Sequence, residues 1–173
     1  MTGKLTVVKG DVTNPQRTTP DEIVIIPHCC NNLGVMGAGV ALALKKKWPA
    51  VYKGYKMTEK QYPNGLKDRL GDNSYIEIID DNHKIVVVNM IAQNMFMSHD
   101  NPKPIKYIAL IDCMKHIATY IEDIKLQVNS NVVIHCPEFG GLRAGGNFEF
   151  ILELIREIWL EHGIDVVIYE FEE

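Results

Sequence analysis

Glycine-rich segments that lead into helical patterns are the parts of this sequence best suited to bind an anion. In the first, a polar stretch that begins at His28 and includes Asn31 is followed by Gly37, Ala38, Gly39 and Val40. Glycine lets the backbone approach a ligand without a Cβ in the way, and the free amides at the start of a helix favour a phosphate group. The alternative is that these glycines only allow tight packing of a helix on a strand.

The second segment holds four glycines within seven residues, between an apolar run and a helical pattern. Its members are Gly140, Gly141, Leu142, Arg143, Ala144, Gly145 and Gly146, and Phe148 follows. Because such a loop is costly in chain entropy, a backbone nest for a diphosphate explains it better than a surface turn does. It is not a P-loop, since no Lys-Ser or Lys-Thr follows the glycines, and it does not match the dinucleotide motif G-x-G-x-x-G.

Two single residues complete the candidate chemistry. Asp11 follows the first apolar run, where its carboxylate either accepts an exocyclic amine or makes a local Asx-type turn. His28 carries an imidazole that titrates near neutral pH and suits general acid–base catalysis. The alternative for His28 is a histidine at the end of a strand that only orients the loop.

A metal site is not expected. Histidine and cysteine occur together at the ends of two apolar runs, as His28, Cys29 and Cys30 and as His135 and Cys136. Thiolates and imidazoles bind zinc, but no C-x-x-C spacing is present, and cysteine is commonly buried without a function.

The apolar runs that must position these residues alternate between strand and helix patterns after the first third of the chain, which indicates an α/β fold. We expect strands at residues 5–9, 22–27, 74–79, 84–91, 131–136 and 165–171, and helices at residues 38–48, 49–62, 105–126 and 148–162. Gly163 is a signal for the end of the last helix. Residues 28–39 and 137–147 then form loops at the carboxyl ends of strands, where open α/β sheets bind ligands.

Composition favours one domain. The chain has 173 residues, of which 46% are apolar and 23% charged, an ordinary globular balance. A net charge of −4 gives no sign of the basic surface that bulk nucleic-acid binding requires.

We expect no membrane contact, because no apolar run approaches roughly 20 residues. Residues 1–10 lack the pattern of a signal peptide, and the four cysteines do not form a secreted disulfide framework, so we expect reduced thiols and a cytoplasmic location.

Taken together and in this order, the segments resemble the macro domain family. Residues 10–13 resemble its G-D-[IV]-T motif, and residues 28–31 resemble N-A-A-N. Residues 36–41 match the M-G-A-G-[IV]-A of the stand-alone ADP-ribose 1″-phosphate phosphatases and terminal ADP-ribose hydrolases. Residues 142–148 match the G-L-A-G-G-x-[WF] loop of that branch only loosely, because Arg143 is inserted.

The resemblance implies a three-layer α/β/α sandwich around a mixed, mostly parallel sheet, formed by residues 1–173 as one macro domain. It implies that Asp11 accepts the adenine amine, that Val12 offers its amide, and that Asn31 reaches the distal ribose. The diphosphate is then held by Gly37, Ala38, Gly39 and Val40 on one side and by Gly140, Gly141, Leu142, Arg143, Ala144 and Gly145 on the other. Phe148, or Phe139, packs against a ribose or the adenine, or else belongs to the core.

The implied ligand is ADP-ribose or ADP-ribose 1″-phosphate, with an ADP-ribosylated protein as an alternative partner, and no cofactor. In the phosphatase branch, His28 is the implied catalytic residue. The lysine and aspartate of the glutamate-hydrolase subgroup correspond here to Gln93 and Ala144, which argues against a lysine mechanism.

Four functions therefore stay open: a phosphatase, a non-catalytic ADP-ribose reader, a mono-ADP-ribosyl hydrolase that uses a bound water, and a nucleotide-binding domain of another family. Ser98, His99 and Asp100 are weaker candidates for a second polar group at the distal ribose.

Overall fold

The protein is built on a six-stranded sheet in the order β1-β6-β5-β2-β4-β3. The computed structural model describes residues 1–141 and 143–171. Its strands are β1 (Leu5–Lys9), β2 (Ile23–Asn31), β3 (Asn73–Asp80), β4 (His83–Gln93), β5 (Val132–Pro137) and β6 (Asp165–Glu170). All neighbours pair in parallel except β3 and β4, which are antiparallel. The predicted mixed, mostly parallel sheet is confirmed.

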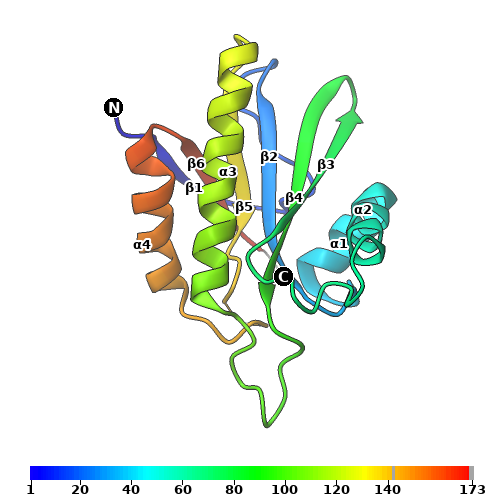
Figure 1. Ribbon diagram of the computed structural model, residues 1–173. Coiled ribbons are helices and arrows are strands. Elements are labelled where there is room, and N and C mark those ends of the chain that lie inside the picture. Colours follow the sequence, from blue (N-terminus) through cyan, green and yellow to red (C-terminus); the bar gives the residue numbers. More distant parts are fainter. Residues whose placement is uncertain (142, 172–173) are drawn as a thin grey trace.

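Helices cover both faces of the sheet, so the predicted three-layer sandwich is also confirmed (Figure 1). On one face lie α1 (Gly39–Lys47) and α2 (Pro49–Lys60); on the other lie α3 (Tyr107–Gln127) and α4 (Phe148–Ile158), followed by a 3-10 turn, η1 (Leu160–His162). No helix within the described ranges is long and apolar enough to cross a membrane.

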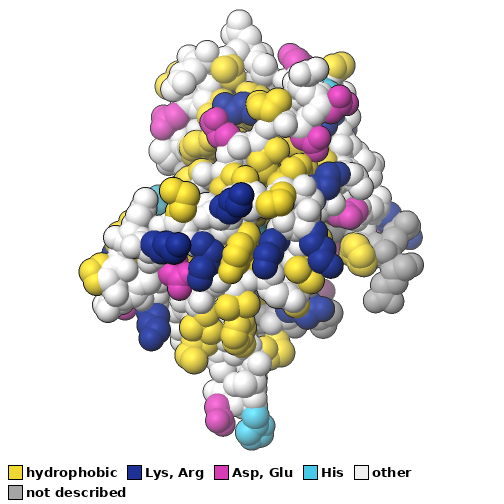
Figure 2. Space-filling model, turned by 90° about the vertical axis from the view of Figure 1, so that its right-hand side faces the viewer, with side chains coloured by type: hydrophobic (Ala, Val, Ile, Leu, Met, Phe, Trp, Pro, Cys, Tyr) yellow, Lys and Arg dark blue, Asp and Glu magenta, His cyan; other side chains and the backbone are white. Residues whose placement is uncertain are grey.

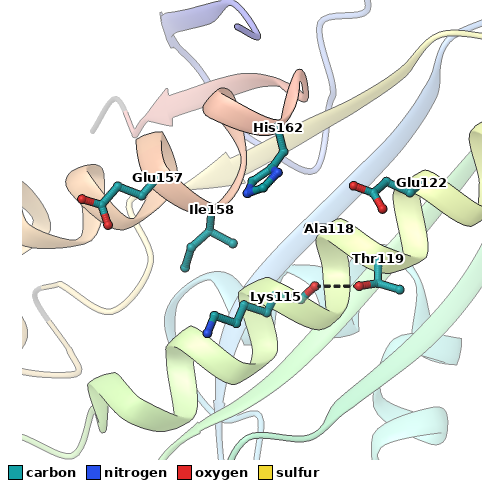
Figure 3. A pocket seen from close by; sticks show the side chains of 7 residues that line it. All are labelled: Lys115, Ala118, Thr119, Glu122, Glu157, Ile158 and His162. Atoms are coloured by element: carbon teal, nitrogen blue, oxygen red, sulfur yellow. Dashed lines mark hydrogen bonds between the residues drawn. The ribbon is translucent and has the colours of Figure 1, made fainter. Parts of the chain in front are cut away.

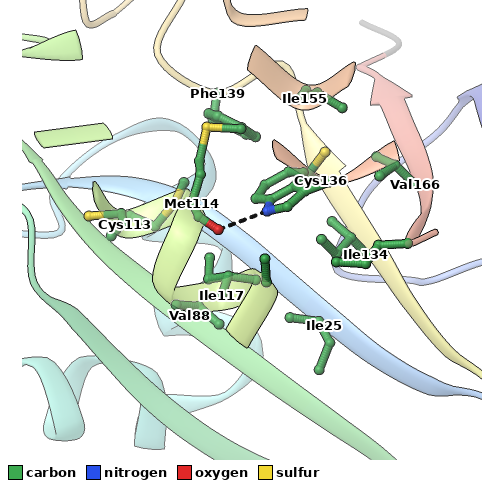
Figure 4. Packing of buried hydrophobic residues seen from close by; sticks show 14 of the residues in the cluster. Ile25, Val88, Cys113, Met114, Ile117, Ile134, Cys136, Phe139, Ile155 and Val166 are labelled. Atoms are coloured by element: carbon green, nitrogen blue, oxygen red, sulfur yellow. Dashed lines mark hydrogen bonds between the residues drawn. The ribbon is translucent and has the colours of Figure 1, made fainter. Parts of the chain in front are cut away.

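Each face of the sheet has its own hydrophobic core. Along β2 the buried residues alternate: Ile25 joins the cluster under α3 and α4, whereas Val24 and Ile26 join the cluster under α1 and α2. This alternation follows from the two-residue period of a strand whose faces are both covered. At the centre of the first cluster, fully buried Trp159 donates its indole N–H to the carbonyl of Met114 at 3.0 Å (Figure 4).

Two predicted boundaries were wrong. The strand expected to end at residue 27 continues through Asn31, because residues 28–30 stay in register with β4 until a bulge at Cys30 and Asn31. Their polar side chains are accommodated by buried hydrogen bonds, which a hydrophobicity pattern does not reveal. The helix expected to run to residue 162 leaves α geometry at Trp159, although Gly163 does close the segment with a left-handed φ of 79°.

Candidate ligand site at the carboxyl edge of the sheet

Parallel pairing brings every glycine-rich segment to one edge of the sheet. β1, β2, β4 and β5 run in the same direction, so their carboxyl ends meet at the lower edge in Figure 1. The segments that follow these strands are residues 10–22, 32–38, 94–106 and 138–147. In a sheet of this type the crevice at that edge is where ligands bind.

The start of α1 has backbone donors without acceptors. Its N-cap, Ala38, makes no side-chain capping hydrogen bond. The amides of Gly37, Gly39 and Val40 donate to no acceptor among residues 1–141 and 143–171. Such unsatisfied amides carry partial positive charge at a helix start, so this end of α1 is suited to an anion.

Asn31 shapes the loop that leads to α1. Its Oδ1 accepts hydrogen bonds from the amide of Leu33 at 3.0 Å and from the hydroxyl of Tyr55 at 3.0 Å. Its Nδ2 donates to the carbonyl of Val35 at 2.8 Å. The side chain is therefore engaged by its own loop and by Tyr55 of α2, and the predicted contact with the distal ribose stays a prediction.

The second glycine-rich loop packs tightly against the segment after β4. Gly145 has a φ of +73°, and a Cβ there would lie 2.3 Å from the carbonyl oxygen of Pro102. A Cβ at Gly146 would lie 2.2 Å from the carbonyl oxygen of Gly140. Buried Ala144 accepts a hydrogen bond from the amide of Ile105 at 3.0 Å. Packing thus requires at least two of the four glycines.

The remaining loop residues differ in their exposure. Gly140 is buried and Gly141 partly buried, and neither amide donates to an acceptor that the structure describes. Arg143 is exposed. Leu142, which was also predicted to hold the diphosphate, lies outside the described residues.

The two glycine-rich loops meet through Arg143. A Cβ on Gly39 would lie 3.1 Å from both Cδ and Nε of Arg143, so this side chain lies directly over the first residue of α1. A guanidinium beside the positive end of a helix is unfavourable by itself. A bound anion between the two removes the repulsion, and it accepts hydrogen bonds from both.

Asp11 lies at the far end of the same edge. Its Oδ1 accepts hydrogen bonds from the amide of Thr13 at 2.9 Å and from the hydroxyl of Thr13 at 2.8 Å, which is the Asx-type turn considered from the sequence. Its Oδ2 accepts none from the described chain. Val12 is buried in the core under α1 and α2. The side chain of Asp11 is therefore oriented and keeps one oxygen for a ligand.

His28 is placed differently from the other predicted residues. Its ring is 2% exposed, on the face of β2 under α2, and its Nε2 lies 2.6 Å from Oδ1 of Asn89. Because Asn89 uses its Nδ2 to donate to the carbonyl of Val51, the Nε2 of His28 is the donor. Burial lowers the pKa of His28 to about 4. This is the environment of a neutral structural histidine, and its predicted catalytic role stays a prediction.

The two phenylalanines considered for the site contribute to the core. Phe139 is buried and packs edge to face against Trp159, with ring centroids 5.9 Å apart, and against Phe148 at 6.4 Å. Phe148 is partly buried and packs on the core under α3 and α4. The structure therefore shows Phe139 as a core residue, which is one of the two roles considered from the sequence.

Comparisons with known proteins bear on the fold and its relatives. No family model matches the sequence. A protein named ADP-ribose 1″-phosphate phosphatase from the yeast Meyerozyma guilliermondii is 34% identical over 74 residues, which is 43% of this chain and 41% of that protein. An uncharacterized 17.5 kDa protein of Enterobacteria phage T4 is 29% identical over 147 residues, or 85% of this chain and 86% of its own.

Solved structures match over nearly the whole chain. A Bacteroides thetaiotaomicron protein of unknown function has a TM-score of 0.80 at 28% identity, covering 96% of this chain and 98% of its own. A macrodomain protein from Streptomyces coelicolor has a TM-score of 0.72 at 25% identity, covering 96% of this chain and 99% of its own. The chain has the macrodomain fold. The macrodomain of Thermus aquaticus DarG shares the fold. It has a TM-score of 0.69 at 22% identity, covering 97% of this chain and 99% of its own.

Three features of this macrodomain edge were not predicted. Buried Asn32, next to Asn31, ties two loops together: its Nδ2 donates to Oδ1 of Asn94 at 3.0 Å, and its Oδ1 accepts from the amide of Met95 at 2.8 Å. Phe171 is 75% exposed and follows Glu170, whose carbonyl accepts from the amide of Gly10. The pairing of β1 with β6 brings this residue close to the turn of Asp11, and no local sequence signal marks it. The third feature is a buried polar chain behind Asp11, described below.

The weaker candidates are not brought into a cluster. Ser98, His99 and Asp100 are exposed in the segment after β4. Within the parts of the chain that are described, no three His, Cys, Asp or Glu side chains gather as metal ligands. The four cysteines are unpaired, and burial raises the pKa of the Cys113 thiol to about 12.

The hollows on the rest of this macrodomain lie away from the carboxyl edge. One is between α3 and α4 near the opposite edge, lined by side chains that include Lys115, Glu122, Glu157 and His162 (Figure 3). On the other face, lysines of α1 and α2 form a row with apolar side chains between them (Figure 2). Residues 39–60 contain six lysines and one glutamate. This face is therefore basic, although the net charge of the whole chain is −4. The expected lack of nucleic-acid binding stays a prediction.

The packing of the second loop predicts which glycines tolerate a side chain. Gly145→Ala forces a Cβ into the Pro102 carbonyl at a left-handed φ, so we expect the free energy of unfolding to fall by about 2–4 kcal/mol. Gly37→Ala is the matched control, because its Cβ would meet only Val35, at 3.6 Å; we expect a change within about 0.5 kcal/mol. Urea denaturation measures both, and equal losses would contradict the packing argument.

The buried environment of His28 predicts a pH dependence of stability. Unfolded His28 takes up a proton near its ordinary pKa of 6.5, whereas folded His28 does so only near 4. The unfolded chain therefore binds more protons between these values, and stability falls as the pH is lowered through them. We expect this residue to account for roughly 2–3 kcal/mol between about pH 7.5 and about pH 4.5.

His28→Gln isolates that contribution, because a glutamine amide can still donate to Asn89 but does not titrate in this range. Urea denaturation of both proteins across the same pH range measures the difference in unfolding free energy. That difference is expected to shrink as the pH falls. Parallel curves would show that His28 titrates normally in the folded protein.

Proposed function

We propose that this macrodomain binds ADP-ribose along the carboxyl edge of the sheet, with residues 1–173 acting as one binding module. The observation that carries the proposal is the position of Arg143 over the uncapped start of α1. Two positive elements from different loops converge there, and a diphosphate satisfies both. A Thermosipho africanus DarTG structure with the same fold, at a TM-score of 0.69 and 18% identity, is a complex with ADP-ribose, which supports the choice of ligand.

The ligand would extend along the edge from Asp11, at its adenine end, toward Asn31, at its distal ribose. Asp11 accepts the adenine amine on Oδ2 while Oδ1 keeps the turn, the amide of Val12 lies beside it, and the exposed ring of Phe171 is available to the base. Asn31 lies toward the distal ribose. The residues proposed to hold the diphosphate through a backbone amide, or through the guanidinium of Arg143, are Gly37, Ala38, Gly39, Val40, Gly140, Gly141, Arg143 and Gly145. Ala144, whose amide already donates to the carbonyl of Gly141 at 3.1 Å, shapes the loop.

We further propose that the protein hydrolyses the phosphate of ADP-ribose 1″-phosphate. The named activity of the yeast relative, over 74 aligned residues, supports this reaction. Water attacks the phosphorus, the bond from phosphorus to the 1″ oxygen breaks, and a proton reaches the departing oxygen, so inorganic phosphate and ADP-ribose are released. The unsatisfied amides and Arg143 would stabilise negative charge on the phosphates.

The second candidate function is a non-catalytic ADP-ribose reader. The placement of His28 favours it, because the ring is buried under α2 and its Nε2 is bonded to Asn89. A general acid–base must reach the proton that it transfers. If His28 does not, either water and the phosphate-binding groups suffice for hydrolysis, or the site only binds.

Binding is tested by calorimetry with ADP-ribose, with AMP and NAD as comparison ligands, on the wild type and Asp11→Asn. Asparagine keeps the Oδ1 that accepts from Thr13 but replaces the free carboxylate oxygen with an amide donor. We expect selective binding of ADP-ribose by the wild type and roughly 10-fold or greater weakening in the variant, the loss of a charged hydrogen bond. A folded wild type that does not bind ADP-ribose would refute the proposal.

Hydrolysis is tested by phosphate release from ADP-ribose 1″-phosphate with the wild type, His28→Gln and Arg143→Gln. If His28 acts directly, its variant should lose activity by about 100-fold or more while it still binds ADP-ribose. Because the ring is buried, we expect instead a smaller change for His28→Gln than for Arg143→Gln. No phosphate release by a wild type that binds ADP-ribose would leave the reader function.

A further inference from the structure

The turn that carries Asp11 is closed by one residue, Gln16. The Nε2 of Gln16 donates to the carbonyl of Lys9 at 3.2 Å, immediately before Gly10. A Cβ on Gly10 would lie 2.9 Å from that same Nε2, at a φ of +150°. Gln16 therefore lies across the base of the turn, and Gly10 leaves the space for it. Whatever holds Gln16 in place also holds the turn that presents Asp11.

Gln16 is held by a buried polar chain that extends from β6 through β5 to Glu22, the residue before β2. Its backbone N–H donates to the hydroxyl of Tyr169 at 2.7 Å. That hydroxyl lies 2.7 Å from Nδ1 of His135, and Nε2 of His135 lies 2.6 Å from Oε2 of Glu22. The other carboxylate oxygen of Glu22 accepts from both the amide and the hydroxyl of Thr18. Tyr169, His135 and Glu22 are 2% exposed or less.

The donors and acceptors present indicate one direction for each hydrogen bond in this chain. The amide of Gln16 is only a donor, so the oxygen of Tyr169 accepts from it and its O–H donates to Nδ1 of His135. Nε2 of His135 then carries the hydrogen and donates to Glu22. Burial raises the pKa of Glu22, but the hydrogen bonds from His135 and Thr18 outweigh it and lower the pKa overall, so this end is an anionic acceptor. Every donor has one acceptor, and reversing one bond leaves a buried group unpaired.

We propose that Tyr169 and Gln16, held by His135 and Glu22, are positioning residues that make the site selective for adenine. The inference rests on the proposed function and adds the residues that set its base specificity. They touch no ligand; they act through Asp11. A rigid turn keeps the carboxylate where it accepts the adenine amine and where it repels a base with a carbonyl oxygen in that place. A mobile turn weakens the attraction and relieves the repulsion.

The measurement is a pair of affinities, for ADP-ribose and for inosine diphosphate ribose, which has hypoxanthine in place of adenine. Hypoxanthine carries a carbonyl oxygen where adenine has its amine. The variant is Tyr169→Phe, which removes the hydroxyl and keeps the ring. Because one hydrogen bond contributes about 0.5–1.5 kcal/mol, we expect ADP-ribose affinity to fall about 2- to 12-fold. Affinity for the hypoxanthine ligand should change little, so the adenine preference should fall by a similar factor.

Tyr75→Phe is the matched control. Its hydroxyl also accepts one hydrogen bond, from Asn73 at 3.0 Å, but it lies on β3 at the opposite edge of the sheet. It should leave both affinities unchanged. A general loss of stability in Tyr169→Phe would lower the fraction of active protein, which calorimetry reads as stoichiometry, and would not alter the ratio of the two affinities.

If Tyr169→Phe does not fold, Gln16→Ala replaces it, because Gln16 is exposed and only its bond to Lys9 is lost. A reduced adenine preference in either variant supports the inference, and an unchanged preference in a folded variant overturns it. A wild type that binds ADP-ribose with no preference over the hypoxanthine ligand also overturns it while the proposed function stands. A wild type that binds neither ligand refutes both.

Discussion

Burial of both faces of β2 is the constraint on which the rest of the structure depends. This strand pairs with β4 on one side and β5 on the other, and helices cover its two faces. A polar group that is buried along it must find a partner in the protein. Glu22, the residue before the strand, pairs with His135, and His28 near its end pairs with Asn89. Because β2 is covered on both faces, the chain turns only after it has reached the carboxyl edge. Asn31 and the start of α1 therefore lie at that edge.

At that edge the groups suited to an anion are mostly backbone amides rather than basic side chains. The donors are backbone amides at the start of α1 and in the loop after β5, and Arg143 is the charged group that joins them. This explains how a chain with a net charge of −4 can suit an anionic ligand: oriented amides act at short range, where the distant surface carboxylates are screened.

Much of the fold followed from the sequence, because continuous apolar runs, helical spacing and Gly163 are local signals. The glycine-rich segments also lie at one edge of the sheet, as the sequence predicted. The sequence was less informative about polar residues inside the sheet. A histidine at a strand end has the same local pattern whether it faces a ligand or a buried asparagine, and only the register of His28 with Asn89 distinguishes the two. Likewise, Phe139 looked suited to a ligand but packs on Trp159, while Phe171 had no local signal at all.

The glycines of the second loop show why packing and binding are not competing explanations. Gly145 and Gly146 are required where the loop contacts Pro102 and Gly140, and the same loop carries Arg143, which lies over the start of α1. Asn32 braces the first loop in the same way, and Gln16 braces the turn of Asp11. A site whose loops are ordered before the ligand arrives avoids much of the conformational entropy cost of binding. The residues that do not touch the ligand therefore contribute to affinity through the folded state, and the buried chain from Glu22 to Gln16 extends this principle across the sheet.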